Sequence, residues 1–182
     1  LGIDAVRSRL VESFRIPSTS MEPSVLQGDY LFADKRYNCP GCKHAVARGD
    51  IAVFTYPNDR TLRYIKRIIA LPGDRVSVRG QRVTVNDTVL ATADAGSGTR
   101  TEHYGDRQWS VIGPADAAAG PTLDLVVPPG HVFVLGDRRD ASTDSRAFGP
   151  VPLQDVVGRA RQVWWSIGPE GVRWGRLGEV LR

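Results

Sequence analysis

Short runs of apolar or alternating residues recur along most of this chain, and Gly, Pro, Asn and Asp residues separate them. Such runs, bounded by turn residues, are typical of β-strands. They cover residues 30–34, 51–57, 62–71, 74–78, 82–86, 123–128, 131–137 and 156–165. Many short strands with few helices predict a mostly β fold with a barrel-like or sandwich-like core.

The N-terminal segment, residues 1–14, has a different spacing. Its apolar residues follow one another at steps of three and four, and they are Ile3, Val6, Leu10 and Phe14. This spacing predicts a short amphipathic helix, which could lie on a membrane or on the domain itself.

The stretch between Asn86 and Pro121 is rich in small and polar residues, as in ATADAGSGTRTEHYGD and GPADAAAGP. Long stretches without apolar runs are uncommon inside a compact core. We therefore expect residues 86–121 to form an inserted loop or small subdomain, and residues 1–85 and 122–182 to form the β core.

Length and composition narrow the class of protein. A chain of 182 residues, of which 41% are hydrophobic, can bury one apolar core and needs no second domain. Its net charge of +4 suits work near an anionic surface but is too small to indicate nucleic-acid binding. The sequence contains no apolar run long enough to span a membrane and no signal peptide, so the chain as given is predicted to be soluble.

The first candidate for chemistry is the pair Ser18 and Ser20, which precedes Met21 and lies between Pro17 and Pro23. Ser and Pro both favour turns, so turn formation alone would explain this stretch. The pair becomes a catalytic candidate only together with a group that can take a proton from a hydroxyl.

Lys66 is such a group, because it interrupts the strongly apolar strand at residues 62–71. Side chains alternate across a strand, so either Lys66 or Arg67 must face a partly apolar surface. Burial disfavours the charged ammonium, and a neutral lysine can accept a proton from a serine hydroxyl. A Ser/Lys pair is a known substitute for the Ser, His and Asp arrangement.

Other catalytic patterns are missing from the sequence. The three histidines, His44, His103 and His131, lie in loop-like or strand-start contexts without a neighbouring nucleophile motif. The Asp-Thr-Gly or Asp-Ser-Gly turns of an aspartic protease, the Gly-x-Ser-x-Gly elbow and a phosphate-binding loop do not occur.

Three stretches together resemble the ordered sequence boxes of bacterial type I signal peptidases. They are IPSTSMEPSVLQGDYL, GDIAVFTYP with YIKRIIALPGDRV, and GDRRDASTDSRAFGPV. The resemblance covers roughly the first half of the chain and residues 131–158. It implies a membrane-anchored serine endopeptidase with a mostly antiparallel β fold, which uses a Ser/Lys dyad and no cofactor to remove signal peptides from exported preproteins.

The boxes also imply individual roles. Ser20 would be the nucleophile and Lys66 the general base, and Ser18 would donate its hydroxyl to the oxyanion beside the Ser20 main-chain N–H. The residues that would orient the lysine amine and form a supporting ion pair are Ser142, and Asp144 with Arg146. Two positions depart from the family pattern, since Ser24 replaces a Thr and Arg138 replaces an Asn.

The resemblance further implies small substrate residues, commonly Ala, immediately before the scissile bond and two positions earlier. Shallow apolar pockets would select them, and the substrate would bind as an added strand. The residues that resemble pocket wall are Phe14, Ile16, Met21, Val25, Leu31, Val53, Tyr64 and Ile65. Without the resemblance, these apolar residues would be assigned to the core.

The two cysteines, Cys39 and Cys42, lie close to His44 in YNCPGCKH. A closed zinc site needs four ligands, and only three are near one another here, so no metal is expected. A local disulfide would fit an oxidising extracytoplasmic compartment, and two reduced thiols in a hairpin loop are the alternative.

Members of the resembled family carry an N-terminal transmembrane helix. We therefore expect this chain, which begins at Leu1, to be a catalytic domain without its anchor, located on the extracytoplasmic face of the cytoplasmic membrane. Trp164, Trp165 and Trp174 could contact the lipid surface or be buried in strands.

Two alternatives stay open. The first is a related peptidase with a narrower task, such as pilin maturation or self-cleavage. The second is an inactive β-domain that binds export substrates or the membrane surface.

Overall fold

The computed structural model describes residues 10–38, 42, 45–94, 98–113 and 122–181, and these are mostly β-strand. The largest sheet has eight strands, in the order β1-β2-β14-β3-β4-β12-β13 with β15 paired to β14. Neighbouring strands in this sheet are antiparallel. The strands are β1 (Val11–Arg15), β2 (Asp29–Asp34), β3 (Ile51–Thr55), β4 (Arg63–Ala70), β12 (His131–Leu135), β13 (Val151–Pro152), β14 (Val156–Gly168) and β15 (Gly171–Val172).

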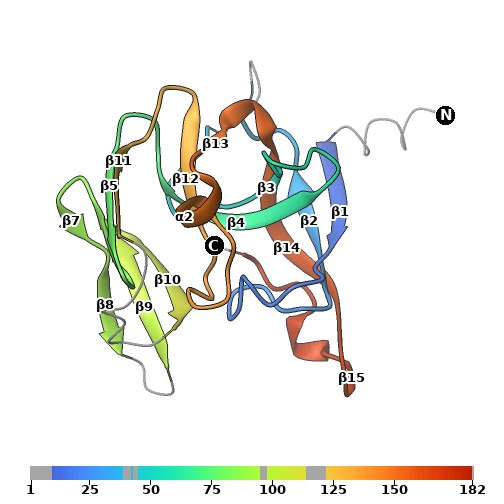
Figure 1. Cartoon of the computed structure of the whole chain (residues 1–182). Helices are drawn as coiled ribbons and strands as arrows, with labels where there is room; N and C mark the ends of the chain where they lie inside the picture. Colours follow the sequence, from blue (N-terminus) through green and yellow to red (C-terminus); the bar gives the residue numbers. More distant parts are fainter. Residues whose placement is uncertain (1–9, 39–41, 43–44, 95–97, 114–121, 182) are drawn as a thin grey trace.

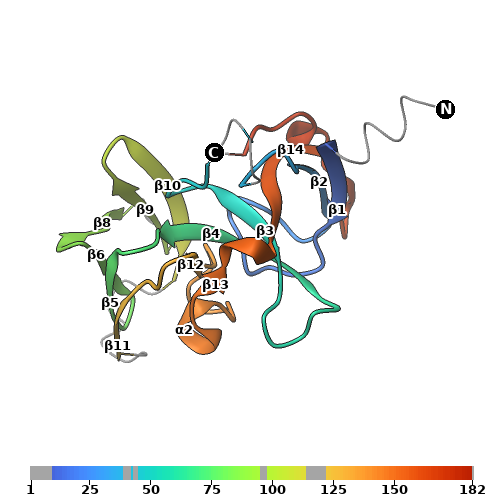
Figure 2. The same ribbon diagram turned by 90° about the horizontal axis from the view of Figure 1, so that it is seen from above.

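Two smaller antiparallel sheets lie on the side of the molecule away from β1 and β2 (Figures 1 and 2). One has the order β11-β5-β6-β7 and the other has the order β10-β9-β8. Their strands are β5 (Arg75–Arg79), β6 (Arg82–Val85), β7 (Thr88–Val89), β8 (Ala91–Asp94), β9 (Thr99–Tyr104), β10 (Arg107–Ile112) and β11 (Thr122–Val126). The short helical turns are α2 (Ser145–Phe148), η1 (Leu153–Asp155) and η2 (Trp174–Arg176).

The predicted mostly β fold is confirmed, and each predicted run contains a strand. The long strand β14 connects the two halves of the large sheet, because its first residues pair with β3 and its later residues pair with β2. Its register shifts along both pairings. Such irregularities bend a strand and increase its twist.

The predicted N-terminal helix is wrong for the residues that the structure describes after Leu10. Val11–Arg15 form strand β1, with Phe14 opposite Leu31 of β2. Exposed and half-buried side chains alternate along β1, as expected for an edge strand with one face on the core. Residues 1–9 of the predicted helix lie outside the described residues.

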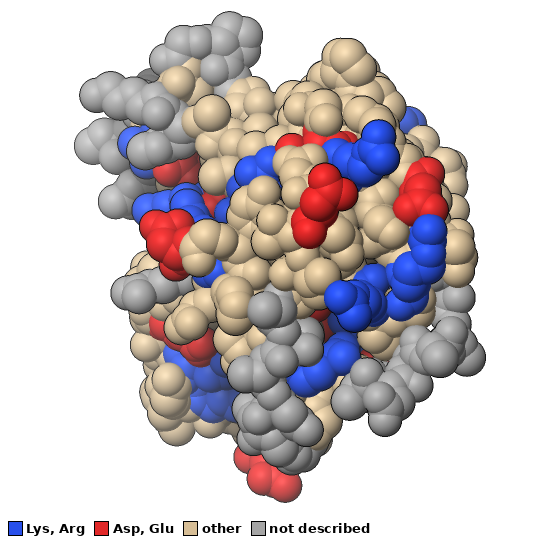
Figure 3. Space-filling model, turned by 90° about the vertical axis from the view of Figure 1, so that its left-hand side faces the viewer, with Lys and Arg blue, Asp and Glu red and all other residues tan. Residues whose placement is uncertain are grey.

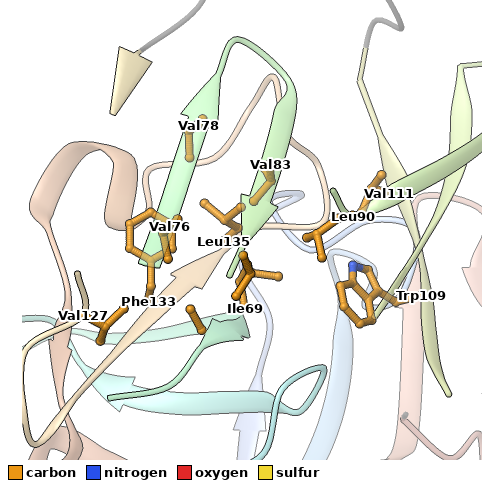
Figure 4. Close-up of a cluster of buried hydrophobic side chains, with 12 residues drawn as sticks. Ile69, Val76, Val78, Val83, Leu90, Trp109, Val111, Val127, Phe133 and Leu135 are labelled. Carbon is orange, nitrogen blue, oxygen red and sulfur yellow. The ribbon is translucent and has the colours of Figure 1, made fainter. Parts of the chain in front are cut away.

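The segment 86–121 contributes to the core, which the sequence did not predict. Leu90, Trp109 and Val111 belong to the same buried cluster as Ile69 and Phe133 of the large sheet (Figure 4). The segment therefore packs against the β core through apolar side chains, while its boundaries as a separate subdomain stay a prediction.

Charges of both signs are mixed on the molecular face shown in Figure 3. Neither sign of charge dominates this face. Among the described residues, no helix has the length and apolar character needed to cross a membrane.

Candidate active site

Ser20 and Lys66 meet in the structure although they are 46 positions apart in the sequence. The Lys66 Nζ lies 2.8 Å from Ser20 Oγ, and it also donates a hydrogen bond to the Ile65 carbonyl at 3.0 Å. Both side chains are buried, with only 8% of Ser20 and 4% of Lys66 exposed. A hydroxyl and an amine at this distance can exchange a proton directly.

Ser20 lies in a tight turn between β1 and β2. Two main-chain bonds stabilise the turn, from Glu22 N–H to the Thr19 carbonyl at 3.0 Å and from Val25 N–H to the Met21 carbonyl at 2.9 Å. The Met21 and Val25 side chains are fully buried in a core cluster. The hydroxyl is therefore held on a turn anchored from both ends.

Strand alternation predicted that either Lys66 or Arg67 faces a partly apolar surface. In the structure both side chains are buried on strand β4. Arg67 is neutralised by a bidentate ion pair with Asp137, at 2.8 and 2.7 Å. Lys66 forms no ion pair with any carboxylate in the described part of the chain. The charge of Arg67 is thus compensated by Asp137, whereas burial favours the neutral form of Lys66.

Burial lowers the pKa of Lys66 from its ordinary value of 10.5 to about 8. The charged form is disfavoured because the amine is removed from water. The carboxylates of Asp144 and Asp137 act in the opposite direction and keep the shift from being larger. A substantial neutral fraction therefore exists near physiological pH.

Ser18 lies beside the nucleophile candidate, with its Oγ 3.2 Å from Ser20 Oγ. Ser18 is solvent-exposed on the rim of a cavity, whereas Ser20 is buried. The hydroxyls of Ser18 and Ser20, two residues apart in the sequence, thus lie side by side at the cavity.

The loop after β12 supplies the other predicted site residues. Asp144 caps helix α2 and accepts two hydrogen bonds from the Arg146 guanidinium, both at 2.8 Å, and one from Gly136 N–H at 3.0 Å. Burial alone would raise the pKa of Asp144, but these donors hold it below its usual value. The predicted Asp144–Arg146 ion pair is present in the structure.

Ser142 is brought to the site by a close approach of backbone at Gly136. A Cβ atom on Gly136 would lie 2.2 Å from Ser142 Oγ and 2.6 Å from the Ser20 carbonyl oxygen, so only glycine fits. Ser142 Oγ is buried near the Asp144 carboxylate, whose pKa it helps to lower, but it forms no hydrogen bond of normal geometry with a described residue. A hydrogen bond from Ser142 to Lys66 is thus not formed, and its orienting role stays a proposal.

A cavity of about 280 Å³ opens onto the Ser20 and Lys66 side chains. Its lining residues are Pro17, Ser18, Ser20, Arg63, Tyr64, Ile65, Lys66, Ala141 and Thr143. Tyr64 and Ile65 were predicted as pocket wall, and the Tyr64 ring lies 5.3 Å from the Lys66 amine. Sequence reasoning missed Pro17, Arg63, Ala141 and Thr143 as lining residues, although each is a direct neighbour of a residue that it did select.

The remaining predicted wall residues are not among those that line this cavity. They belong to, or pack against, one core cluster beneath the Ser20 turn, and they are Phe14, Ile16, Met21, Val25, Leu31 and Val53. Their location agrees with a core role, and their contact with substrate stays a prediction.

The cysteine stretch is only partly described. Cys39 and His44 lie outside the described residues, so the predicted Cys39–Cys42 disulfide stays a prediction. No cluster of His, Cys, Asp and Glu suited to a metal ion occurs in the portion of the chain that the structure covers.

Comparison with known proteins identifies a family for this arrangement. Residues 3–165 match the family model described as signal peptidase, peptidase S26. A signal peptidase I from Pseudomonas fluorescens is 34% identical over 190 residues, which cover 88% of this chain and 67% of the relative. A signal peptidase I from Rickettsia canadensis (strain McKiel) is 29% identical over 197 residues, which cover 88% and 74% respectively.

Among solved structures, a signal peptidase I from Enterococcus faecalis V583 aligns with a TM-score of 0.43 and 30% identity, over 63% of this chain and 95% of that chain. The match to the family model covers most of the present chain and includes the Ser20 turn, strand β4 and the Asp144 loop. The chain therefore belongs to the signal peptidase family, peptidase S26, and is a serine endopeptidase.

Proposed function

We propose that this protein removes signal peptides from exported preproteins, with Ser20 as the nucleophile and Lys66 as the general base. The observation that carries the proposal is the 2.8 Å contact between Ser20 Oγ and a buried lysine amine whose pKa is lowered to about 8. A neutral amine at that distance can accept the hydroxyl proton as Ser20 attacks.

The chemical steps follow from this pair. Ser20 Oγ attacks the scissile carbonyl carbon while its proton moves to Lys66 Nζ, which gives a tetrahedral intermediate. The ammonium then protonates the departing amine, the peptide bond breaks, and an acyl-enzyme ester on Ser20 remains. Lys66, neutral again, takes a proton from water as the water attacks the ester, and it then returns a proton to Ser20 Oγ as the C–O bond breaks and the new carboxyl terminus is released.

The Ser18 hydroxyl and the Ser20 main-chain N–H are the proposed donors to the oxyanion. Ser18 Oγ already lies within 3.2 Å of the attacking oxygen, on the cavity side of the turn. Donors fixed in advance stabilise the developing negative charge without reorganisation. Ser142 is the proposed orienting group for the Lys66 amine once substrate excludes water from the site.

The substrate would bind as an extended strand along the first residues of β4. Residues 63–67 pair with β3 on one side, but β12 begins its pairing with β4 only at Arg67. The edge at residues 63–66 is therefore free on the cavity side to accept main-chain hydrogen bonds from a peptide. Tyr64 and Ile65 narrow the cavity there, which favours small side chains of the Ala-x-Ala type.

A lipid surface is the second proposed partner, on the extracytoplasmic side of the cytoplasmic membrane. Trp164 is 40% exposed on β14, and its ring lies 5.7 Å from the exposed Phe32 ring on β2. Trp174 of η2 is 70% exposed, and its ring lies 6.2 Å from the Trp165 ring. Exposed tryptophans are enriched at membrane–water interfaces.

The proposal is tested by cleavage of a peptide with an Ala-x-Ala site in detergent, by the wild type and by Ser20→Ala and Lys66→Ala. We expect cleavage after the second Ala by the wild type and its loss in both variants. Activity that survives either substitution would overturn the dyad. A wild type that leaves this peptide intact but processes a pilin precursor would favour the narrower peptidase.

A further inference from the structure

The short segment 136–139, directly after β12, is held between the nucleophile turn and the small sheet β8–β10. On one side, Arg138 N–H donates to the Ser20 carbonyl at 3.1 Å. On the other side, Ile112 N–H donates to the Asp137 carbonyl at 2.9 Å, and Arg139 N–H donates to the Ile112 carbonyl at 2.8 Å. Strand β10 therefore fixes the segment that contacts Ser20.

Glu102 of β9 adds a buried side-chain contact to the same segment. The Glu102 carboxylate is 1% exposed and accepts a bidentate hydrogen bond from the Arg139 guanidinium, which is 2% exposed. The Trp109 indole N–H donates to the same carboxylate at 3.0 Å. A planar fork between buried charges fixes orientation as well as distance.

The Arg139 guanidinium transmits this orientation toward the proposed catalytic residues. Its Nε donates to the Gly136 carbonyl at 3.1 Å, and Gly136 N–H in turn donates to Asp144. Gly136 cannot move toward the site, because its Cα already packs closely against Ser142 Oγ and the Ser20 carbonyl oxygen. A small displacement of Gly136 would therefore shift Ser142, Asp144 and Ser20 relative to one another.

We infer that Glu102, a residue of the segment 86–121, is a positioning residue for the peptidase reaction, acting through Arg139 and Gly136 on the Ser20 and Lys66 pair. Glu102 does not touch the reacting atoms. This inference rests on the proposed function of Ser20 and Lys66. The small sheet β8–β10 would then support catalysis through Glu102, in addition to contributing apolar side chains to the core.

The alternative is that Glu102 serves stability alone, and a matched control separates the two. Glu102→Gln keeps the shape of the side chain but removes the charge that orients Arg139. Val111→Ala weakens the same sheet and the same core cluster but leaves the Glu102 and Arg139 side chains themselves unchanged. Arg139→Lys keeps a positive charge near Glu102 but cannot span both the carboxylate and the Gly136 carbonyl.

Each variant is assayed on the Ala-x-Ala peptide at a temperature well below its own unfolding midpoint. We expect kcat to fall about tenfold or more for Glu102→Gln and for Arg139→Lys, with KM changed less than about twofold. Val111→Ala should lower the unfolding midpoint and leave kcat near the wild-type value. A wild-type kcat for Glu102→Gln, or an equal loss for Val111→Ala, would overturn the inference.

A second readout does not depend on activity. In the Ser20→Ala background, amide hydrogen exchange at Gly136 and Arg138 should become faster with Glu102→Gln and stay unchanged with Val111→Ala under conditions where both are folded. Unchanged exchange with Glu102→Gln would contradict the positioning role. Failure of the proposed function would show separately, as full activity of the Ser20→Ala enzyme.

Discussion

At the scale of single residues, the proposed chemistry depends on Lys66, which is buried without an ion-pair partner among the described carboxylates. Lys66 and Arg67 are both buried on one strand, yet only Arg67 has a paired carboxylate. A buried ammonium without a partner lowers the stability of the folded protein. The same penalty lowers the pKa of the amine, so that the neutral amine can act as a base. Stability and activity therefore oppose each other at Lys66.

Replacing the lysine with a neutral side chain of similar length should stabilise the protein. Between about pH 8 and 10.5 the unfolded chain holds a proton that native Lys66 has lost, so wild-type stability rises with pH in this window. The shift corresponds to roughly 3 kcal/mol. We expect Lys66→Met to raise the free energy of unfolding at pH 7 by roughly 1–3 kcal/mol, and to flatten the rise, measured by urea denaturation at several pH values. Lower stability of Lys66→Met at pH 7 would contradict this reasoning.

Ser18 provides the second residue-scale prediction. Loss of its hydroxyl should remove one oxyanion donor and lower kcat roughly 100-fold with KM nearly unchanged. Steady-state kinetics of Ser18→Ala would show this loss, and Ser18→Thr, which keeps a hydroxyl, should retain most of the activity. A kcat for Ser18→Ala close to that of the wild type would remove Ser18 from the oxyanion site.

The sequence could predict the residues of the site better than their contacts. Ser20 and Lys66 were candidates from their local sequence context, whereas Asp144 and Arg146 were implied only by the resemblance to the signal peptidase boxes. The Glu102–Arg139 pair joins residues 37 positions apart and belongs to no local motif. Only the folded chain shows that these two charges compensate each other.

At the scale of elements, the apolar runs of the core predicted strands correctly, but strands β7–β10 lie in the segment expected to be a loop or small subdomain, and the predicted N-terminal helix was wrong. Apolar spacing in residues 1–14 fits a helix, but Val11–Arg15 pair with β2 and become an edge strand. Tertiary pairing overrides local propensity most easily in such short segments. The pairing places Phe14 opposite Leu31, and Phe14 thereby packs against the core cluster that contains Leu31.

The Arg67–Asp137 ion pair ties strand β4 to the end of β12, and it yields an element-scale prediction. Arg67→Met should lower the free energy of unfolding by about 3–5 kcal/mol, because Asp137 would stay buried without a partner. The double variant Arg67→Met with Asp137→Leu should recover much of that loss. Denaturation curves for both variants test this, and a loss below about 1 kcal/mol for the single variant would contradict it.

At the scale of the whole molecule, the site lies between strand β4, the turn after β1 and the loop after β12. The large sheet supplies Ser20 and Lys66 through β1, β2 and β4, and the small sheet β8–β10 holds the segment 136–139. Figure 1 shows α2 and its loop beside β4 and β12. The exposed aromatic residues of β2 and β14 lie on the large sheet, away from both small sheets.

This arrangement predicts which surface contacts lipid. The double variant Trp164→Ala with Phe32→Ala should bind phospholipid vesicles about tenfold more weakly than the wild type, because it removes apolar area from the contact. Val126→Ala, an exposed residue on the small sheet that contains β11, is the matched control and should bind normally. Vesicle sedimentation measures both, and equal binding by the double variant and the wild type would exclude this surface.

The most direct test of the Ser20 and Lys66 dyad is the pH dependence of kcat/KM on an Ala-x-Ala peptide. This parameter reports the pKa of the essential base in the free enzyme. We expect kcat/KM to rise with pH through a midpoint near 8, where Lys66 becomes neutral. A midpoint near 10.5, the ordinary value for lysine, or a profile without a rise, would contradict the assignment of Lys66 as the base.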